Sequence, residues 1–194
     1  MIDPRAIPPT PYIMLGSGIR FPFHGTTVAH INLEDIVSSL SRQVRFNGHG
    51  QRMQSIAAHC LLVAELSPPE HRLAALVHDA AEAYTGDLTR PLKMVIGDTY
   101  HEIEDRLNQL VRDWAGLPGD RWPAEVKHAD MQALYIEGVA LFGSAVVDTW
   151  ATPAFPELLS EAHTWAPNTF SPSYVMQRYR YQIIEAVRDR RGVS

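Results

Sequence analysis

Residues 73–87 read LAALVHDAAEAYTGD and contain an adjacent histidine and aspartate within an alanine-rich, apolar stretch. The apolar spacing predicts one helix that runs to about Tyr84 and ends at Gly86. Burial of an imidazole beside a carboxylate costs free energy unless a partner compensates both groups. A divalent metal ion is the obvious partner of His78 and Asp79, because neutral imidazole and carboxylate oxygen are both good ligands.

Two further acids accompany this pair. Glu82 lies four residues after His78 and three after Asp79, so one continuous helix would place all three side chains on the same face. Asp87 follows just after a Thr-Gly break in the pattern. The segment therefore predicts a helix and a turn that together carry two metal ligands and two more carboxylates.

The start of this helix also has a sequence signal. Ser67 is the expected N-cap, Pro68 takes the first helical position, and Glu70 completes a capping box. Proline suits the first helical turn because the missing N–H has no helical partner there.

The rest of the chain predicts an all-α fold, a single domain over residues 1–194 in the form of a compact helical bundle. Residues 1–30 are rich in proline and glycine, which predicts an irregular segment with at most a short β-hairpin over residues 12–15 and 19–23. Further helices are expected over residues 33–44 after the cap Asn32, 53–66, 98–115 before Gly116, from Pro123 onward, and 171–191.

Three segments are given other interpretations. Residues 89–93 are expected to be extended or a turn, and residues 101–105 to form a solvated acidic face. Residues 143–170 form a long connection, with a short helix over residues 155–162. We leave open whether this connection is a lid or an oligomer contact.

Composition limits the class of protein. A length of 194 residues with 45% hydrophobic content is enough for one domain with a real core. The net charge of -5 argues against a nucleic-acid-coating protein, so no stable nucleic-acid partner is expected. A single cysteine, Cys60, suits a reducing cytoplasm, and no signal peptide or membrane-spanning run is recognised.

Three motifs occur in order along the chain: SIAAH ending at His59, HDAAEAYTGD from His78, and EVKHAD ending at Asp130. This arrangement resembles the HD-domain superfamily of metal-dependent phosphohydrolases. The resemblance implies a metal site made by His59, His78, Asp79 and Asp130. Four ligands in order, each in a segment predicted to be helical, are a far more specific signal than a lone His-Asp pair.

A narrower resemblance covers roughly residues 19–137. The pieces RQVRF at 42–46, the motif at 78–87 and RPLK at 90–93 are similar to small bacterial 5'-deoxynucleotidases and to phage dATP triphosphohydrolases. The resemblance implies that Arg45, Lys93 and Lys127 contact phosphate, and that Phe46 lies beside the substrate. Glu82 and Asp87 become the candidate catalytic residues, with Glu82 the proton donor or acceptor.

Two activities compete within this resemblance. Three candidate cations favour a longer phosphate chain, so the leading prediction is a deoxynucleoside triphosphate triphosphohydrolase, with adenine preference left open. The alternative is a 5'-deoxynucleotidase that removes phosphate from deoxynucleoside monophosphates. A third candidate is a non-catalytic nucleotide-binding module, which loss of a ligand would favour, but no ligand is lost. A fourth is an HD-type di-iron oxygenase, which would need additional histidine ligands that we cannot place convincingly.

The expected cofactor is a divalent ion, with cobalt, manganese, magnesium, zinc and iron all open. The expected partner is a small deoxynucleotide substrate. We expect a cytoplasmic homo-oligomer with no membrane association.

Overall fold

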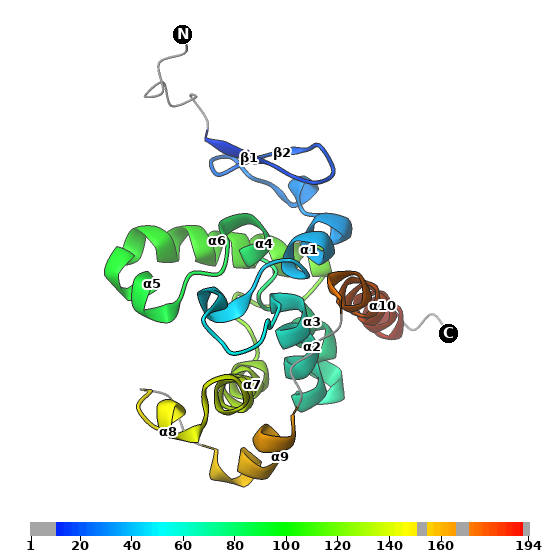
Figure 1. The fold of residues 1–194 in the computed structure, drawn as a ribbon. Helices are drawn as coiled ribbons and strands as arrows, with labels where there is room; N and C mark the ends of the chain where they lie inside the picture. Colours follow the sequence, from blue (N-terminus) through cyan, green and yellow to red (C-terminus); the bar gives the residue numbers. More distant parts are fainter. Residues whose placement is uncertain (1–10, 151–154, 166–170, 192–194) are drawn as a thin grey trace.

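The computed structural model describes residues 11–150, 155–165 and 171–191, and the regular secondary structure of this part is helical apart from one two-stranded hairpin (Figure 1). This confirms the expected all-α fold with a short N-terminal hairpin. The elements in chain order are β1 Tyr12–Met14, β2 Arg20–Pro22, η1 Val28–His30, α1 Leu33–Leu40, η2 Arg45–Gly48, α2 Ile56–Leu66, η3 Pro69–His71, α3 Arg72–Val77, α4 Glu82–Thr85, α5 Arg90–Ile96, α6 Asp98–Ala115, α7 Ala124–Phe142, α8 Ser144–Val147, η4 Pro156–Leu158, α9 Leu159–Thr164 and α10 Pro172–Arg191.

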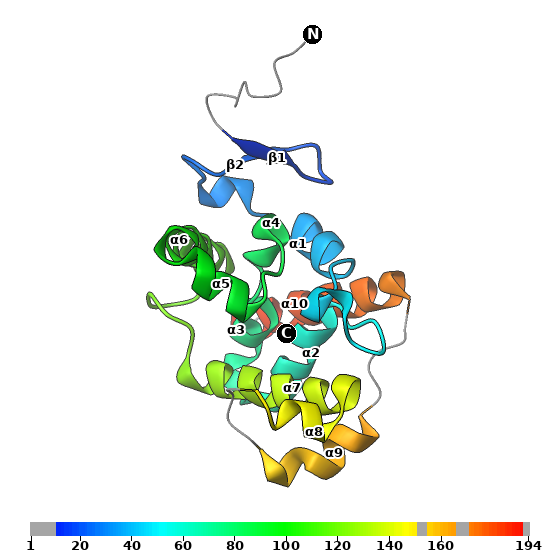
Figure 2. The ribbon, with the colours of Figure 1, turned by 60° about the vertical axis from the view of Figure 1, so that its left-hand side comes forward.

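Helix α2 lies at the centre of the fold. Every residue from Ile56 to Ala64 is buried, and the helix packs against α3, α7 and α10. Figures 1 and 2 show α2 and α3 in the middle, with the hairpin at one end and α7, α8 and α9 at the other. A helix that is apolar on all sides is expected in such a central position. His59 therefore lies in the core, at the heart of one continuous apolar cluster.

The N-terminal hairpin agrees with the sequence pattern. β1 and β2 pair antiparallel, with Ile13 opposite Phe21. Phe21 is fully buried and stacks on Tyr84 with ring centroids 4.1 Å apart. This stacked pair attaches the hairpin to α4, the helix that begins at Glu82.

Helix α1 begins as expected but ends early. The Asn32 side chain accepts a hydrogen bond from the Asp35 backbone N–H, which confirms the cap. The predicted end at Val44 was wrong, since α1 stops at Leu40. The chain then returns toward α2: Val44 forms a β-bridge with Ser55, and the Arg45 N–H donates to the Gln54 carbonyl.

The continuous helix predicted from Ser67 to Tyr84 was wrong. Ser67 ends α2, because its backbone N–H donates to the Val63 carbonyl and its side chain makes no cap. Helix α3 starts at Arg72 and stops after Val77, and residues 78–81 form tight turns before α4.

Two neighbouring predictions also need correction. Residues 90–96 form helix α5 instead of an extended segment, with Pro91 in its first turn, where proline is tolerated. On α6, Glu104 is not part of a solvated face, because it is paired with Lys93. The bounds of α6 agree with the prediction, and Gly116 closes it in the left-handed conformation.

The C-terminal part follows the expected pattern. Helix α7 begins directly after Pro123, and η4 with α9 covers the short helix predicted over residues 155–162. The buried face of α10 includes Val175, Tyr179 and Ile183. Within the described residues, no helix is long and apolar enough to cross a membrane.

Helix α7 contains one glycine, Gly138, and the residues packed around it leave no room for a side chain. A Cβ there would lie 2.7 Å from Trp150 Cζ3 and 2.9 Å from Val147 Cγ2. Glycine to alanine in a helix normally gains up to ~1 kcal/mol, but overpacking costs ~1–3 kcal/mol. We therefore expect Gly138→Ala to lower the free energy of unfolding by about 1–2 kcal/mol, measured by urea titration.

The control for this prediction is the same change in a Trp150→Ala background. With the indole removed, only the contact with Val147 Cγ2 remains, so the loss should become clearly smaller. Equal destabilisation in both backgrounds would contradict the packing explanation.

Candidate metal centre

Four side chains from three parts of the fold meet beside α2. His59 comes from α2, His78 and Asp79 from the turn after α3, and Asp130 from α7. His59, His78 and Asp79 each offer a ligand atom within 4.8 Å of the others, so this group could hold a metal ion. The structure therefore brings together the residues that the motifs predicted as ligands.

The distances within this group suit a shared ion. His59 Nε2 lies 3.0 Å from Asp130 Oδ1 and 3.6 Å from Asp79 Oδ2. His78 Nε2 lies 3.3 Å from Asp79 Oδ1 and 3.8 Å from Asp130 Oδ1. Ligand atoms held about 2.1 Å from one ion lie roughly 3–3.5 Å from each other. Two of the four separations lie in this range and the other two slightly exceed it, so the side chains are close to the spacing of neighbouring ligands.

Both imidazoles are oriented by hydrogen bonds on the opposite ring nitrogen. His78 Nδ1 lies 2.8 Å from the Ala75 carbonyl, and His59 Nδ1 lies 3.1 Å from each carboxylate oxygen of Glu137. The Nε2 atoms of both rings are buried and face Asp79 and Asp130. Donation from Nδ1–H leaves the Nε2 lone pair available, which is the usual arrangement of metal-binding histidines. These residues fit a divalent ion.

The electrostatics of the group also favour a cation. Burial disfavours the charged form of His78, but Asp79 and Asp130 raise its pKa well above the ordinary value. Burial raises the pKa of Asp130, but hydrogen bonds from His59 and His78 bring it well below the ordinary value. The carboxylates therefore surround the two rings with negative potential that a bound ion would neutralise.

Glu137 is a residue of the site that the sequence motifs did not predict. It is fully buried on α7 and contacts three polar side chains: His59, Gln54 Nε2 at 2.9 Å and Arg45 Nε at 2.9 Å. One sequence feature could have pointed to Glu137: it stands seven residues after Asp130, two turns along the same helical face. A carboxylate that orients a ligand histidine is a common partner in metal sites.

Arg45 lies at the edge of the group, held through Nε by Glu137. Its Nη1 is 3.8 Å from Asp79 Oδ2. Burial opposes the charged guanidinium, but Glu137, Asp79 and Asp130 raise its pKa above the ordinary value. A guanidinium has five N–H donors, so pairing with Glu137 leaves donors for a substrate.

Glu82 is buried beside this group and shares a lysine with Glu104. Lys93 Nζ lies 2.5 Å from Glu104 Oε1 and 3.5 Å from Glu82 Oε1, while Glu82 Oε2 has no hydrogen-bond partner in the described part of the chain. Burial, together with the charges of Asp79 and Asp87, raises the pKa of Glu82 well above the ordinary value. Glu82 is thus an acid that retains its proton to a higher pH than an exposed glutamate.

The remaining predicted site residues lie at different distances from the group. Asp87 is half-buried, and burial raises its pKa above the ordinary value. Arg45 and Lys93 lie close enough to oppose part of this rise. Lys127 is exposed, forms no hydrogen bond or ion pair with any described residue, and lines a surface hollow with Asp105 and Asn108. No hydrogen bond or ion pair joins Lys127 to the four-ligand group.

Phe46 lies beside Arg45 in an aromatic cluster. The Arg45 guanidinium is 5.2 Å from the centre of its ring, and the rings of Phe142 and Trp150 lie 5.3 and 5.9 Å away. Phe46 has a φ of 54°, which is uncommon for a residue with a side chain. This conformation is held next to a candidate substrate contact, where strained backbone often occurs.

The position of Glu137 gives a direct prediction. Glu137→Gln should weaken metal binding about 10–100-fold, because the neutral amide holds the His59 ring less firmly than the carboxylate does. Calorimetric titration with Mn²⁺ would measure the change. The exposed Glu125→Gln on the same helix serves as the control, and unchanged affinity in Glu137→Gln would contradict the role of Glu137.

Comparisons with known proteins identify relatives. No family model matches the chain. The chain is 36% identical to the uncharacterized protein YfdR of Escherichia coli over 65% of its own length and 70% of that relative. It is 38% identical to the uncharacterized protein RCAP_rcc00048 of Rhodobacter capsulatus over 68% of its own length and 74% of that relative. The chain therefore belongs to the protein family that contains YfdR and RCAP_rcc00048.

Proposed function

We propose that this chain is a divalent-metal-dependent phosphohydrolase that acts on deoxynucleotides. The observation that carries the proposal is the pair of buried imidazoles, each held at Nδ1 and directed through Nε2 at Asp79 and Asp130. The resemblance of the three motifs to HD-domain phosphohydrolases supplies the class of reaction. A cytoplasmic location and homo-oligomeric assembly are part of the same proposal.

The residues around the group have separate roles in this proposal. When bound, the divalent ion supplies Lewis-acid activation of water and of a phosphoryl oxygen. Arg45 donates hydrogen bonds to the anionic oxygens of the substrate through the N–H groups that Glu137 does not use. Glu82 gives a proton to the departing 5'-oxygen, a step for which a buried carboxyl with a raised pKa is suited. Lys93 holds Glu82 in position.

The two candidate activities differ in the number of phosphates that must be bound. The prediction of a triphosphate substrate depended on three cations, Arg45, Lys93 and Lys127. Lys93 is shared by two carboxylates, and Lys127 is exposed and forms no hydrogen bond or ion pair with any described residue. This arrangement favours the second candidate, a 5'-deoxynucleotidase, more than the sequence did.

The deciding experiment is a screen of the four dNTPs and four dNMPs with Mn²⁺, Co²⁺ and Mg²⁺, with products resolved by chromatography. Nucleoside with triphosphate would identify the triphosphohydrolase, and nucleoside with inorganic phosphate from dNMPs would identify the nucleotidase. Metal binding without turnover of any of these substrates would contradict the phosphohydrolase proposal and favour a nucleotide-binding module.

A further inference from the structure

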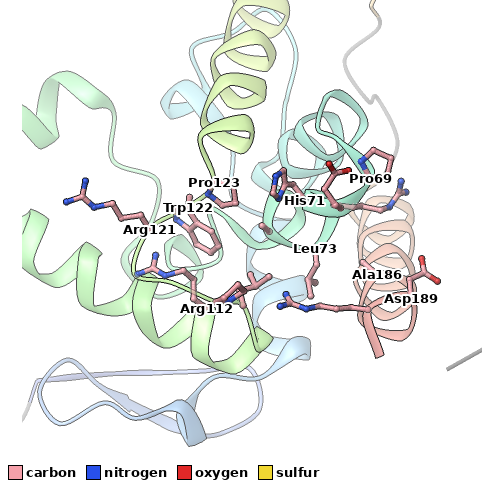
Figure 3. Close-up of a pocket in the computed structure, with 15 residues that line it drawn as sticks. Pro69, His71, Leu73, Arg112, Arg121, Trp122, Pro123, Ala186 and Asp189 are labelled. Atoms are coloured by element: carbon pink, nitrogen blue, oxygen red, sulfur yellow. The ribbon is translucent and has the colours of Figure 1, made fainter. Parts of the chain in front are cut away.

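A cavity of about 500 Å³ lies on another part of the surface, lined by the start of α3, the end of α6, the connection before α7 and the end of α10. Figure 3 shows Arg112 and Trp122 on one side of it and Ala186 and Asp189 of α10 on the other. None of the candidate metal ligands or substrate contacts lines it. Its volume is in the range typical of small-molecule sites.

Arg112 is the polar side chain that distinguishes this cavity. It is only 4% exposed, and Nη2 lies 2.7 Å from both Gln109 Oε1 and the Asp120 carbonyl. Its guanidinium lies over the Trp122 ring, 5.1 Å from the ring centre. Its buried Nε has no hydrogen-bond partner among the described residues. A buried cation with an unused N–H donor is costly unless an acceptor occupies the cavity.

Other cations at the rim add to this charge. Arg121 and Arg190 line the cavity, are exposed, and form no hydrogen bond or ion pair with any described residue. Glu70 and Asp189 are the acidic residues of the lining, so arginines outnumber them although the whole chain carries a net charge of -5. The local excess of guanidinium groups favours an anionic ligand.

The rest of the lining is mainly apolar. Leu73 and Ala74 of α3, Leu117, Pro123 and the Trp122 ring form most of the wall. Apolar walls with a few convergent polar groups are typical of sites for organic ligands, whereas a bare inorganic ion would gain little from them. The ligand should therefore have both an apolar body and an anionic head.

We propose that this cavity binds a small organic oxyanion, with a phosphate or carboxylate head on Arg112, Arg121 and Arg190 and a flat apolar body against Trp122 and Leu73. Guanidinium groups bind both kinds of head through paired N–H donors. The proposal concerns a second binding site and does not depend on the activity proposed for the metal centre.

The test uses the full chain and two probes, phenylphosphonate and benzoate, with benzyl alcohol as the uncharged control. Calorimetry should detect binding of at least one anion to wild type and none of the alcohol, and the stronger probe identifies the head group. Arg121→Gln and Arg190→Gln together should weaken binding roughly tenfold or more, because each change removes a charged hydrogen-bond donor. The matched control is Arg188→Gln, which is also on α10 but does not line the cavity.

Two further measurements locate the bound probe. Arg45→Gln should leave binding unchanged, because Arg45 belongs to the metal centre. The probe should also protect Arg121, but not Arg188, from modification by phenylglyoxal, read by mass spectrometry. No heat from either anion at about 10 mM, a concentration that would fill even a weak site, would overturn the proposal. Equal binding by the double variant and wild type, or loss of binding in Arg45→Gln, would also overturn it.

Discussion

Asp79→Ala is expected to remove the bound metal and abolish phosphohydrolase activity while leaving the helical fold in place. The Asp79 carboxylate lies 3.3 Å from His78 Nε2 and 3.6 Å from His59 Nε2, so, like Asp130, it faces both imidazoles. Loss of a direct ligand should cost more than the ~10–100-fold that follows loss of a ligand's hydrogen-bond partner. The fold should survive because Asp79 lies in a turn and its side chain is partly exposed.

Metal content by mass spectrometry, helicity by circular dichroism and turnover should be measured on one preparation. Asp105→Ala is the matched control, since Asp105 is exposed on α6 and forms no hydrogen bond or ion pair with any described residue. Full metal content and full turnover in Asp79→Ala would refute the assignment of the centre. Loss of helicity would instead show that the carboxylate has a structural role.

Glu82→Gln is expected to keep the metal and bind substrate normally, but to lose most of kcat. Glu82 is buried, its Oε2 lacks a hydrogen-bond partner among the described residues, and its Oε1 lies 3.5 Å from Lys93 Nζ. Glutamine keeps the shape of the side chain but has no proton to transfer. General acid–base catalysis typically contributes ~10²–10⁴-fold, and a 5'-oxygen is a poor leaving group that needs such help.

A fall in kcat and kcat/KM together, with unchanged substrate affinity, would indicate an interaction made mainly in the transition state. Single-turnover rates, calorimetric affinity and metal content would be compared with the exposed control Glu102→Gln. If metal disappears together with the rate, Glu82 is a ligand and a second ion should be sought. If the rate survives, Asp87, whose pKa is also raised by burial, becomes the better candidate for proton transfer.

Local signals in the sequence predicted local features of the fold correctly. The Asn32 cap, the Gly116 end of α6, the hairpin and the buried face of α10 each depend on hydrogen bonds or apolar spacing within a few residues. One failure occurred where two local signals compete for the same residue. The Ser67-Pro68 pattern reads as a helix start, but the Ser67 backbone completes the preceding helix.

The sequence by itself determined which residues make the candidate centre, because His59, His78, Asp79 and Asp130 stand in a recognisable order. Only the tertiary structure decided how they are held. The Glu137 contacts with His59 and Arg45 and the Glu104 contact with Lys93 join residues of different elements, and no spacing rule predicts such pairs. The exposure of Lys127 in a surface hollow with Asp105 and Asn108 was likewise decided by the packing of α7 against its neighbours. Secondary structure follows from contacts between near neighbours in the chain, whereas a buried charge takes its partner from whichever helix the core places beside it.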